Sequence, residues 1–302
     1  MSAPFSGSTL LSMLLCSQPR SIGFGDTYHG KDSDPRNECT CGVSFLECQP
    51  RNESQDEVRR GGLSDFSWAT ASPVPVPRWM SVQARAYWPL ALSVSLYPVR
   101  SIPAWLRQRL FRRFYLENRL ILSGLAKTGR YDYYFDGCKN PVRLELLRTE
   151  ISNLKVIHLV RHPAAFVYHF YRLGERKPEE RLRQWRNYHR KVRTFLKYFG
   201  NENYLPVTYE DVVGQPGVFL RTVADFLGMD QVDDSPPFLL RRSEIHIQGN
   251  KMRKTADRVL NMANKWHGKL PEPLVQTAME SLHELPWAAS MYESRSPNDD
   301  RN

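Results

Sequence analysis

Ala3-Pro4-Phe5-Ser6-Gly7-Ser8-Thr9-Leu10-Leu11 is the stretch of this sequence from which the fold is most readily inferred. Small and hydroxyl-bearing residues run directly into an apolar helical pattern that continues to Leu15. The N–H groups of a first helical turn and the positive end of the helix dipole attract anions, and a glycine lets the backbone approach a ligand closely. The stretch therefore indicates a phosphate-binding loop, or alternatively a serine-rich helix start. It is not a Walker A loop, because no Gly-Lys-Ser or Gly-Lys-Thr ends it.

A loop of this type normally follows a buried strand at the carboxyl edge of a parallel sheet. Only Met1–Pro4 precede it here, so we expect a very short or truncated first strand, or further residues upstream. Strand-like patterns follow at Ser21–Phe24, Tyr133–Asp136, Lys155–Val160 and Tyr204–Tyr209. Helical patterns alternate with these strands, and this order predicts an α/β fold with a parallel sheet.

The composition of the 302-residue chain limits the classes of partner. Hydrophobic residues make up 41% of the chain, which is enough for a core, and the formal net charge is +10. A basic chain favours an anionic partner such as a nucleotide, a sulfated or phosphorylated substrate, nucleic acid or a membrane surface. No run of about 18 apolar residues and no signal-peptide pattern is present, so we expect no membrane span and a cytoplasmic protein.

Polar and proline-rich residues set two regions apart from the rest of the chain. Residues 29–78 read as a long irregular insertion, and residues 291–302 read as a disordered tail. Residues 1–290 are therefore expected to form one domain that contains the insertion. The basic helical pattern at 178–199 suits a solvated face with its aromatic residues packed inward, and we expect no nucleic-acid partner.

A second candidate anion site follows the clearest strand of the chain. Arg161 comes directly after Lys155–Val160, at the edge where open α/β sheets bind ligands. Its guanidinium can hold a phosphate with two parallel hydrogen bonds. The alternative is an arginine that closes the sheet against a carboxylate.

These segments, taken in order, resemble the sulfotransferases that use 3′-phosphoadenosine 5′-phosphosulfate as donor. The resemblance spans about residues 3 to 282. Its segments are Pro4–Leu11, Asp136–Leu144 (similar to the D-x-x-K-x-P segment of the carbohydrate-like and bacterial branches), Val156–Pro163, Thr208–Val212 with Phe226–Gly228, and His246–Arg253 with Trp266. The resemblance implies a P-loop-like fold with three layers around a central parallel sheet. It also implies transfer of a sulfonate group to an acceptor hydroxyl or amine, without a required metal.

The resemblance assigns roles to the matched positions of this sequence. Ser6, Gly7, Ser8 and Thr9 would hold the 5′-phosphosulfate. Arg161 would hold the 3′-phosphate, and Arg253, with Gly249 and Asn250 nearby, would complete the 3′-phosphate and adenine site.

Two positions depart from the family pattern. Position 5 is Phe, where family members usually carry a lysine or arginine that stabilises charge on the leaving phosphate. Lys139 is our candidate for the replacement cation, ahead of Arg20. Position 169 is His, where the family pattern has a serine that contacts the 3′-phosphate. His169 either takes over this contact, with an altered pH dependence, or is a packed helix residue.

Sulfonate transfer also needs a base for the acceptor's proton, and several residues are candidates. Asp136 lies at a strand end three residues before Lys139, so a base and a cation can face one pocket. The alternative is that Asp136 caps the loop or pairs with Lys139. Asp26 and His29 are further candidates, whereas His158 lies in mid-strand and is expected to be a buried structural residue.

Three cysteines leave the metal question open. Cys39, Cys41 and Cys48 could ligate zinc with His29 as the fourth residue, or Cys48 could form a disulfide. However, the C-x-C spacing is tighter than usual in zinc sites and no fourth ligand is obvious, so we predict no metal site.

Three functions remain in view. The first is an active sulfotransferase, and the second is a catalytically impaired nucleotide-binding relative, suggested by Phe5 and His169. The third is an ATP-using kinase-like enzyme, which the missing P-loop lysine disfavours. The acceptor (a glycan, a lipid or a small molecule) has no readable code, because acceptor pockets are built from loops.

Overall fold

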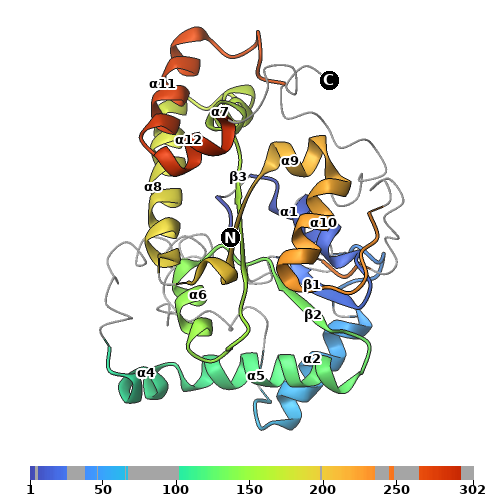
Figure 1. Cartoon of the computed structure of the whole chain (residues 1–302). Helices are drawn as coiled ribbons and strands as arrows, with labels where there is room; N and C mark the ends of the chain where they lie inside the picture. Colours follow the sequence, from blue (N-terminus) through green and yellow to red (C-terminus); the bar gives the residue numbers. More distant parts are fainter. Residues whose placement is uncertain are drawn as a thin grey trace. The chain divides into compact units, whose positions relative to one another are not determined.

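The computed structural model describes residues 1–3, 6–25, 38–45, 47–64, 66, 102–197, 199–234, 245–247 and 265–293 (Figure 1). The chain divides into two compact units. Unit 1 contains Met1–Leu11, Lys155–Leu239 and Ala256–Asn302, and unit 2 contains Ser12–Leu154 and Leu240–Thr255. The expected single domain over residues 1–290 stays a prediction.

A parallel pair of strands forms the centre of unit 1. Strand β3 (Val156–Val160) pairs in parallel with β4 (Tyr204–Thr208), without a shift in register. Both strands read as near-continuous apolar runs in the sequence, which is typical of buried parallel strands. Ser2 makes an isolated parallel bridge to Leu159, and the N-terminal amino group donates to the Ile157 carbonyl at 2.7 Å. The residues before the loop therefore run beside β3.

The helices of unit 1 pack around this pair. They are α7 (Pro163–Arg172), α8 (Pro178–Leu196), α9 (Tyr209–Gly214), α10 (Pro216–Leu227), α11 (Glu272–His283) and α12 (Pro286–Glu293), with the short 3-10 helix η2 (Asn201–Asn203) before β4. Helices α7, α8 and α11 pack against one another (Figure 1). Leu182, Trp185 and Val192 of α8 are buried, whereas Arg183 and Arg190 are exposed. The inward apolar face and solvated basic face predicted for this helix are thus confirmed.

A buried pair of imidazoles joins β3 to α8. His158 Nε2 lies 2.9 Å from His189 Nδ1, and His158 Nδ1 lies 3.1 Å from the Tyr204 hydroxyl. Burial lowers the pKa of both imidazoles, so both are neutral near pH 7. His158 is therefore a buried residue of the interior, as the sequence indicated.

Unit 2 contains a second parallel pair. Helix α1 (Ser8–Cys16) leads from the loop to β1 (Ser21–Gly25), which pairs in parallel with β2 (Tyr133–Asp136). The other described helices are α2 (Gln49–Arg60), α4 (Ala104–Leu110), α5 (Arg112–Lys127) and α6 (Pro141–Arg148). Ile22 and Phe24 of β1 form a core cluster with Val58 of α2 and Ile121 and Leu125 of α5. The described residues thus form a mixed α/β fold that contains two pairs of parallel strands.

The expectation of an irregular insertion over residues 29–78 is wrong for helix α2. Pro50 lies in its first turn, and Gly61 follows its last residue. Only Val58 is apolar beyond that proline, so the sequence carries little amphipathic signal. The helix is stabilised instead by close packing on α5, where a Cβ at Gly124 would lie 3.0 Å from the Cβ of Glu57.

Two further expectations concern the chain end and membranes. Residues 291–293 belong to α12, so the predicted disordered tail is wrong for these three residues. The remainder of that tail lies outside the described residues. Among the described helices, none has the length and apolar character needed to cross a membrane.

Candidate functional site

The loop before α1 has the geometry of an anion cradle. Gly7 has a φ of +90°, and its carbonyl accepts from Leu11 N–H at 3.1 Å as the helix begins. Ser6 is fully buried, and its hydroxyl has no hydrogen-bond partner among the residues that the structure describes. A buried hydroxyl is normally hydrogen-bonded. The Ser6 hydroxyl is therefore available to a ligand, beside the N-terminus of a helix that favours negative charge.

Tyr209 connects this loop to Arg161. A Cβ on Gly7 would lie 2.3 Å from Cδ2 of Tyr209, so the ring packs directly against the loop backbone. The guanidinium carbon of Arg161 lies 4.8 Å from the centroid of the same ring. Arg161 follows β3 and Tyr209 follows β4, so both lie at the carboxyl edge of one parallel pair. This is the edge where α/β folds bind ligands.

The segment around Arg161 is firmly anchored. The Arg161 carbonyl accepts from Trp185 Nε1 at 3.1 Å. The backbone N–H of His162 donates to Glu210 Oε1 at 3.1 Å, and the Tyr292 hydroxyl donates to Glu210 Oε2 at 3.0 Å. Glu210 therefore holds the turn after β3, which fixes the position of Arg161.

His169 lies on α7, two turns after Arg161, and is half-buried. Burial and the positive charges of Arg161 and Arg172 hold the pKa of this imidazole below its ordinary value. The imidazole of His169 also packs edge to face with the ring of Phe170, with 5.3 Å between the two ring centroids. The structure thus shows His169 as a half-buried helix residue, and its contact with a 3′-phosphate stays a prediction.

Asp136 and Lys139 lie in unit 2, at the end of β2 and in the loop before α6. Asp136 caps this loop, as one alternative held, because Oδ1 accepts from Cys138 N–H at 2.8 Å. Its ion pair, however, is with Arg143, at 2.7 Å between Nη2 and Oδ2, rather than with Lys139. The Arg143 side chain is 3% exposed and also donates to Asn118 Oδ1 at 2.6 Å, so it ties this loop to α5.

Arg20, the second candidate for a replacement cation, has a local role in the structure. Its Nη2 donates to Asp132 Oδ1 at 2.8 Å and to the Gly129 carbonyl at 3.0 Å. This guanidinium therefore closes the turn before β2.

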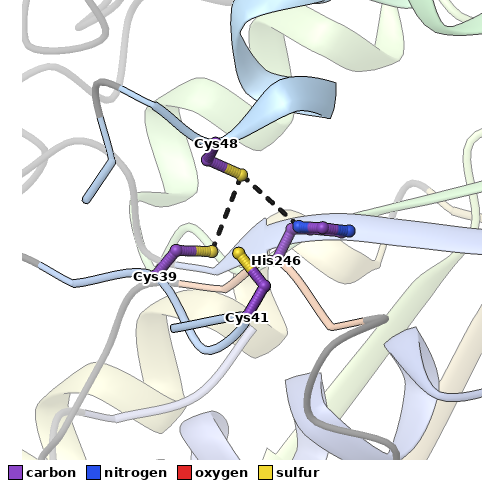
Figure 2. Close-up of side chains that lie close together, drawn as sticks. All are labelled: Cys39, Cys41, Cys48 and His246. Carbon is purple, nitrogen blue, oxygen red and sulfur yellow. Dashed lines mark hydrogen bonds between the residues drawn. The ribbon is translucent and has the colours of Figure 1, made fainter. Parts of the chain in front are cut away.

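The three cysteines of the 38–48 segment come together with a histidine far along the chain. Figure 2 shows Cys39, Cys41 and Cys48 turned toward His246. Cys48 Sγ lies 3.6 Å from Cys39 Sγ and 3.4 Å from His246 Nδ1. The sequence considered His29 as the fourth residue, and His29 lies outside the described residues. Phe5, Asp26, Gly249, Asn250 and Arg253 also lie outside them.

Sequence reasoning missed three residues that organise these sites. Tyr209 contacts both Gly7 and Arg161, Arg143 pairs with Asp136, and His246 lies beside the cysteines. The only available signal was position within a motif, since each of the three belongs to a segment already noted for other residues. Their partners lie on distant segments, which a local pattern does not name.

Comparisons with known proteins agree with the geometry. A model of the sulfotransferase family matches residues 1–234. The sulfotransferase domain from the Synechococcus PCC 7002 olefin synthase is similar in structure, with a TM-score of 0.54, 20% identity, and coverage of 98% of this chain and 94% of that chain. The sulfotransferase domain from the curacin biosynthetic pathway has a TM-score of 0.50 and 18% identity, over 94% of this chain and 95% of that chain. No curated protein sequence matches significantly. The structural likeness concerns the fold, and the family match over most of its length shows that this chain belongs to the sulfotransferase family.

Proposed function

We propose that this protein transfers a sulfonate group from 3′-phosphoadenosine 5′-phosphosulfate to an acceptor hydroxyl or amine. Membership of the sulfotransferase family implies an enzyme with a sulfate donor and an acceptor. The observation that carries the proposal is the buried hydroxyl of Ser6, which has no hydrogen-bond partner in the described part of the chain. It lies in a loop that contacts Tyr209, whose ring also contacts Arg161. A helix start and a guanidinium at one sheet edge supply two anion sites, which a donor with separated phosphates requires.

The donor-binding roles follow from this arrangement. Ser6, Gly7, Ser8 and Thr9 hold the 5′-phosphosulfate with backbone N–H groups and hydroxyls. Arg161 holds the 3′-phosphate, and His169 adds a hydrogen bond to it. Arg253 completes this site by the family resemblance alone.

The catalytic roles are assigned to the loop after β2. Sulfonate transfer resembles phosphoryl transfer, in which positioning and charge stabilisation dominate. Lys139 stabilises the charge on the leaving phosphate in place of the cation that Phe5 replaces. Asp136 accepts the acceptor's proton while Arg143 holds its carboxylate in place. The Arg143 guanidinium competes with the acceptor's proton for the Asp136 carboxylate. The role of Lys139 is therefore better supported than the role of Asp136 as the base. Metal is not required, because cations and backbone N–H groups do the charge work.

Several finer features belong to the same proposal. The parallel strands form one central sheet with helices on both sides, in a P-loop-like topology with a short first strand. The protein acts in the cytoplasm on a glycan, a lipid or a small molecule, without a nucleic-acid partner. A catalytically impaired nucleotide-binding protein is the alternative, which the phenylalanine at position 5 favours.

Calorimetric titration with 3′-phosphoadenosine 5′-phosphate, the desulfonated donor, tests the proposal. We expect the bisphosphate to bind and ATP to bind weakly, because only the former carries a 3′-phosphate for Arg161. Binding of ATP alone would indicate a kinase-like enzyme, and failure of the bisphosphate to bind would reject donor use. Turnover is then measured as bisphosphate release with glycan, lipid and phenol acceptors. Lys139→Ala should keep the bisphosphate affinity and lose about 10²- to 10³-fold in turnover.

Binding of the bisphosphate is expected to strengthen as the pH falls from about 8 to about 6, because of His169. In the free protein the pKa of this imidazole is lowered, so the ring is neutral at pH 7. A 3′-phosphate beside the ring would raise that pKa, so binding takes up a proton and is favoured by acid. Calorimetry in buffers of different ionisation enthalpy measures this uptake.

His169→Asn is the matched control, because asparagine can donate a hydrogen bond but does not titrate in this range. The bisphosphate's own ionisation affects both proteins equally. The difference in slope between them therefore reports His169. Identical pH profiles for the two proteins would remove His169 from the donor site.

A further inference from the structure

Three thiols and one imidazole converge within unit 2. The candidate ligand atoms of Cys39, Cys41, Cys48 and His246 all lie within 4.8 Å of one another. His246 is 198 positions from Cys48 in the sequence, so the fold, and not local spacing, brings the four together. Figure 2 shows that all four side chains point into one small space.

The distances between these atoms match the edges of a tetrahedral zinc site. Zinc binds sulfur at about 2.3 Å and imidazole nitrogen at about 2.0–2.1 Å, which gives tetrahedral edges of about 3.8 Å for S···S and about 3.6 Å for S···N. The Cys39–Cys48 sulfurs are 3.6 Å apart, and Cys48 Sγ lies 3.4 Å from His246 Nδ1. A disulfide would require about 2.05 Å between sulfurs. The distances between the four ligand atoms therefore fit a zinc site, and Cys39 and Cys48 are too far apart to form a disulfide in this structure.

A tight turn explains how a C-x-C spacing can serve such a site. The N–H of Cys39 donates to the Val43 carbonyl at 2.7 Å, and the N–H of Gly42 donates to the Cys39 carbonyl at 3.0 Å. Gly42 has a φ of +95°, a conformation that favours glycine. The chain reverses at this point, with Glu38 bridging Ser44 in antiparallel fashion. The reversal presents the thiols of Cys39 and Cys41 to the same side.

The start of helix α2 supports the sulfur of Cys48. Cys48 is the residue directly before α2, where the helix dipole favours a negative sulfur. A positive dipole end beside a thiolate ligand stabilises its charged form.

The surroundings hold the ligands rigidly. Phe45 is 3% exposed and packs with the cysteines, and the Arg51 guanidinium lies 4.5 Å from its ring centroid. Ile245 and Ile247, on either side of His246, are fully buried. The Thr40 hydroxyl donates to the Ile247 carbonyl at 2.9 Å. The cysteine turn and the histidine segment are therefore already joined without an ion.

We propose that Cys39, Cys41, Cys48 and His246 bind one structural zinc ion, which fastens residues 38–48 to residues 245–247 in unit 2. Three sulfurs and one imidazole form a ligand set that binds zinc in preference to magnesium or calcium. The protein supplies all four ligands, which is the arrangement of structural rather than catalytic zinc. The ion takes no part in sulfonate transfer. The sequence-based prediction of no metal rested on the lack of a fourth ligand, and His246 supplies one.

Metal binding is tested on the full chain, purified with reductant, stripped with a chelator and then titrated with zinc or cobalt(II). We expect one ion per chain. Cobalt should give the intense visible bands of a tetrahedral site and a thiolate charge-transfer band in the near ultraviolet. Cys48→Ser and His246→Gln should weaken zinc binding by about 100-fold or more. Cys138→Ser, which alters a cysteine outside the cluster, should bind zinc as the wild type does.

A measurement on the wild-type protein keeps the proposal testable if these variants fold poorly. The chain has five cysteines, and alkylation followed by peptide mapping reports each one. Zinc should protect Cys39, Cys41 and Cys48, whereas labelling of Cys138 should be the same with and without zinc. Three results would overturn the proposal. The first is labelling of Cys39, Cys41 and Cys48 that is the same with and without zinc, and the second is binding of less than one ion per chain. The third is a Cys39–Cys48 disulfide that excludes zinc in protein prepared with both zinc and reductant. Bisphosphate binding is measured separately, so failure of one proposal does not decide the other.

Discussion

Replacing Arg161 by alanine is expected to weaken binding of 3′-phosphoadenosine 5′-phosphate by about 2–4 kcal/mol, or roughly 30- to 700-fold in Kd. The guanidinium lies at the carboxyl edge of β3 and over the ring of Tyr209, which orients it. A guanidinium binds a phosphate with two charge-assisted hydrogen bonds, and alanine removes both. Calorimetry with the wild-type and variant proteins measures the loss.

Two comparisons make the Arg161 result specific. Adenosine 5′-phosphate lacks the 3′-phosphate, so its affinity should fall far less in Arg161→Ala. Equal losses for the two nucleotides would refute the 3′-phosphate role. Arg221→Ala removes an exposed arginine of α10 that pairs with Asp234, and it should leave both affinities nearly unchanged. Arg161→Lys should recover part of the loss, since lysine keeps the charge but not the planar fork.

Gly7→Ala is expected to abolish measurable donor binding. Position 7 has a φ of +90°, which for a residue with a side chain stores strain of about 1–3 kcal/mol. In addition, the new Cβ would lie 2.3 Å from Cδ2 of Tyr209. Either the loop moves, which displaces the Ser6 hydroxyl, or the ring moves, which removes the support of Arg161. Both responses damage the donor site, and calorimetry with the bisphosphate detects them.

Gly174→Ala is a control that separates the effect of backbone strain from the effect of a steric clash with Tyr209. Gly174 also lies in unit 1 and has a φ of +78°, and a Cβ there would meet none of the described residues within 4 Å. This variant should lose stability in urea unfolding, by the same backbone strain, but keep its bisphosphate affinity. Unchanged affinity in Gly7→Ala, or an equal loss in Gly174→Ala, would show that contact with Tyr209 does not govern the loop.

Local patterns were informative where the structure itself is locally encoded. Strands β3 and β4 were predicted because buried parallel strands appear as continuous apolar runs. The end of α10 was recognisable because Gly228, with a φ of +71°, provides a left-handed cap. Helix α2 escaped notice because its stability depends on packing at Gly124 of α5, which its own residues do not reveal.

The sequence alone determined which residues are placed at element boundaries: a small-residue loop before α1, Arg161 after β3 and Asp136 at the end of β2. Turns and strand ends depend on residues only a few positions apart, so the local sequence is enough to specify them. Only the tertiary structure decided which side chains meet. Tyr209 contacts both Gly7 and Arg161, Arg143 pairs with Asp136, and His246 lies beside cysteines about two hundred residues earlier in the sequence. These contacts join distant segments, and packing of the whole chain selects them.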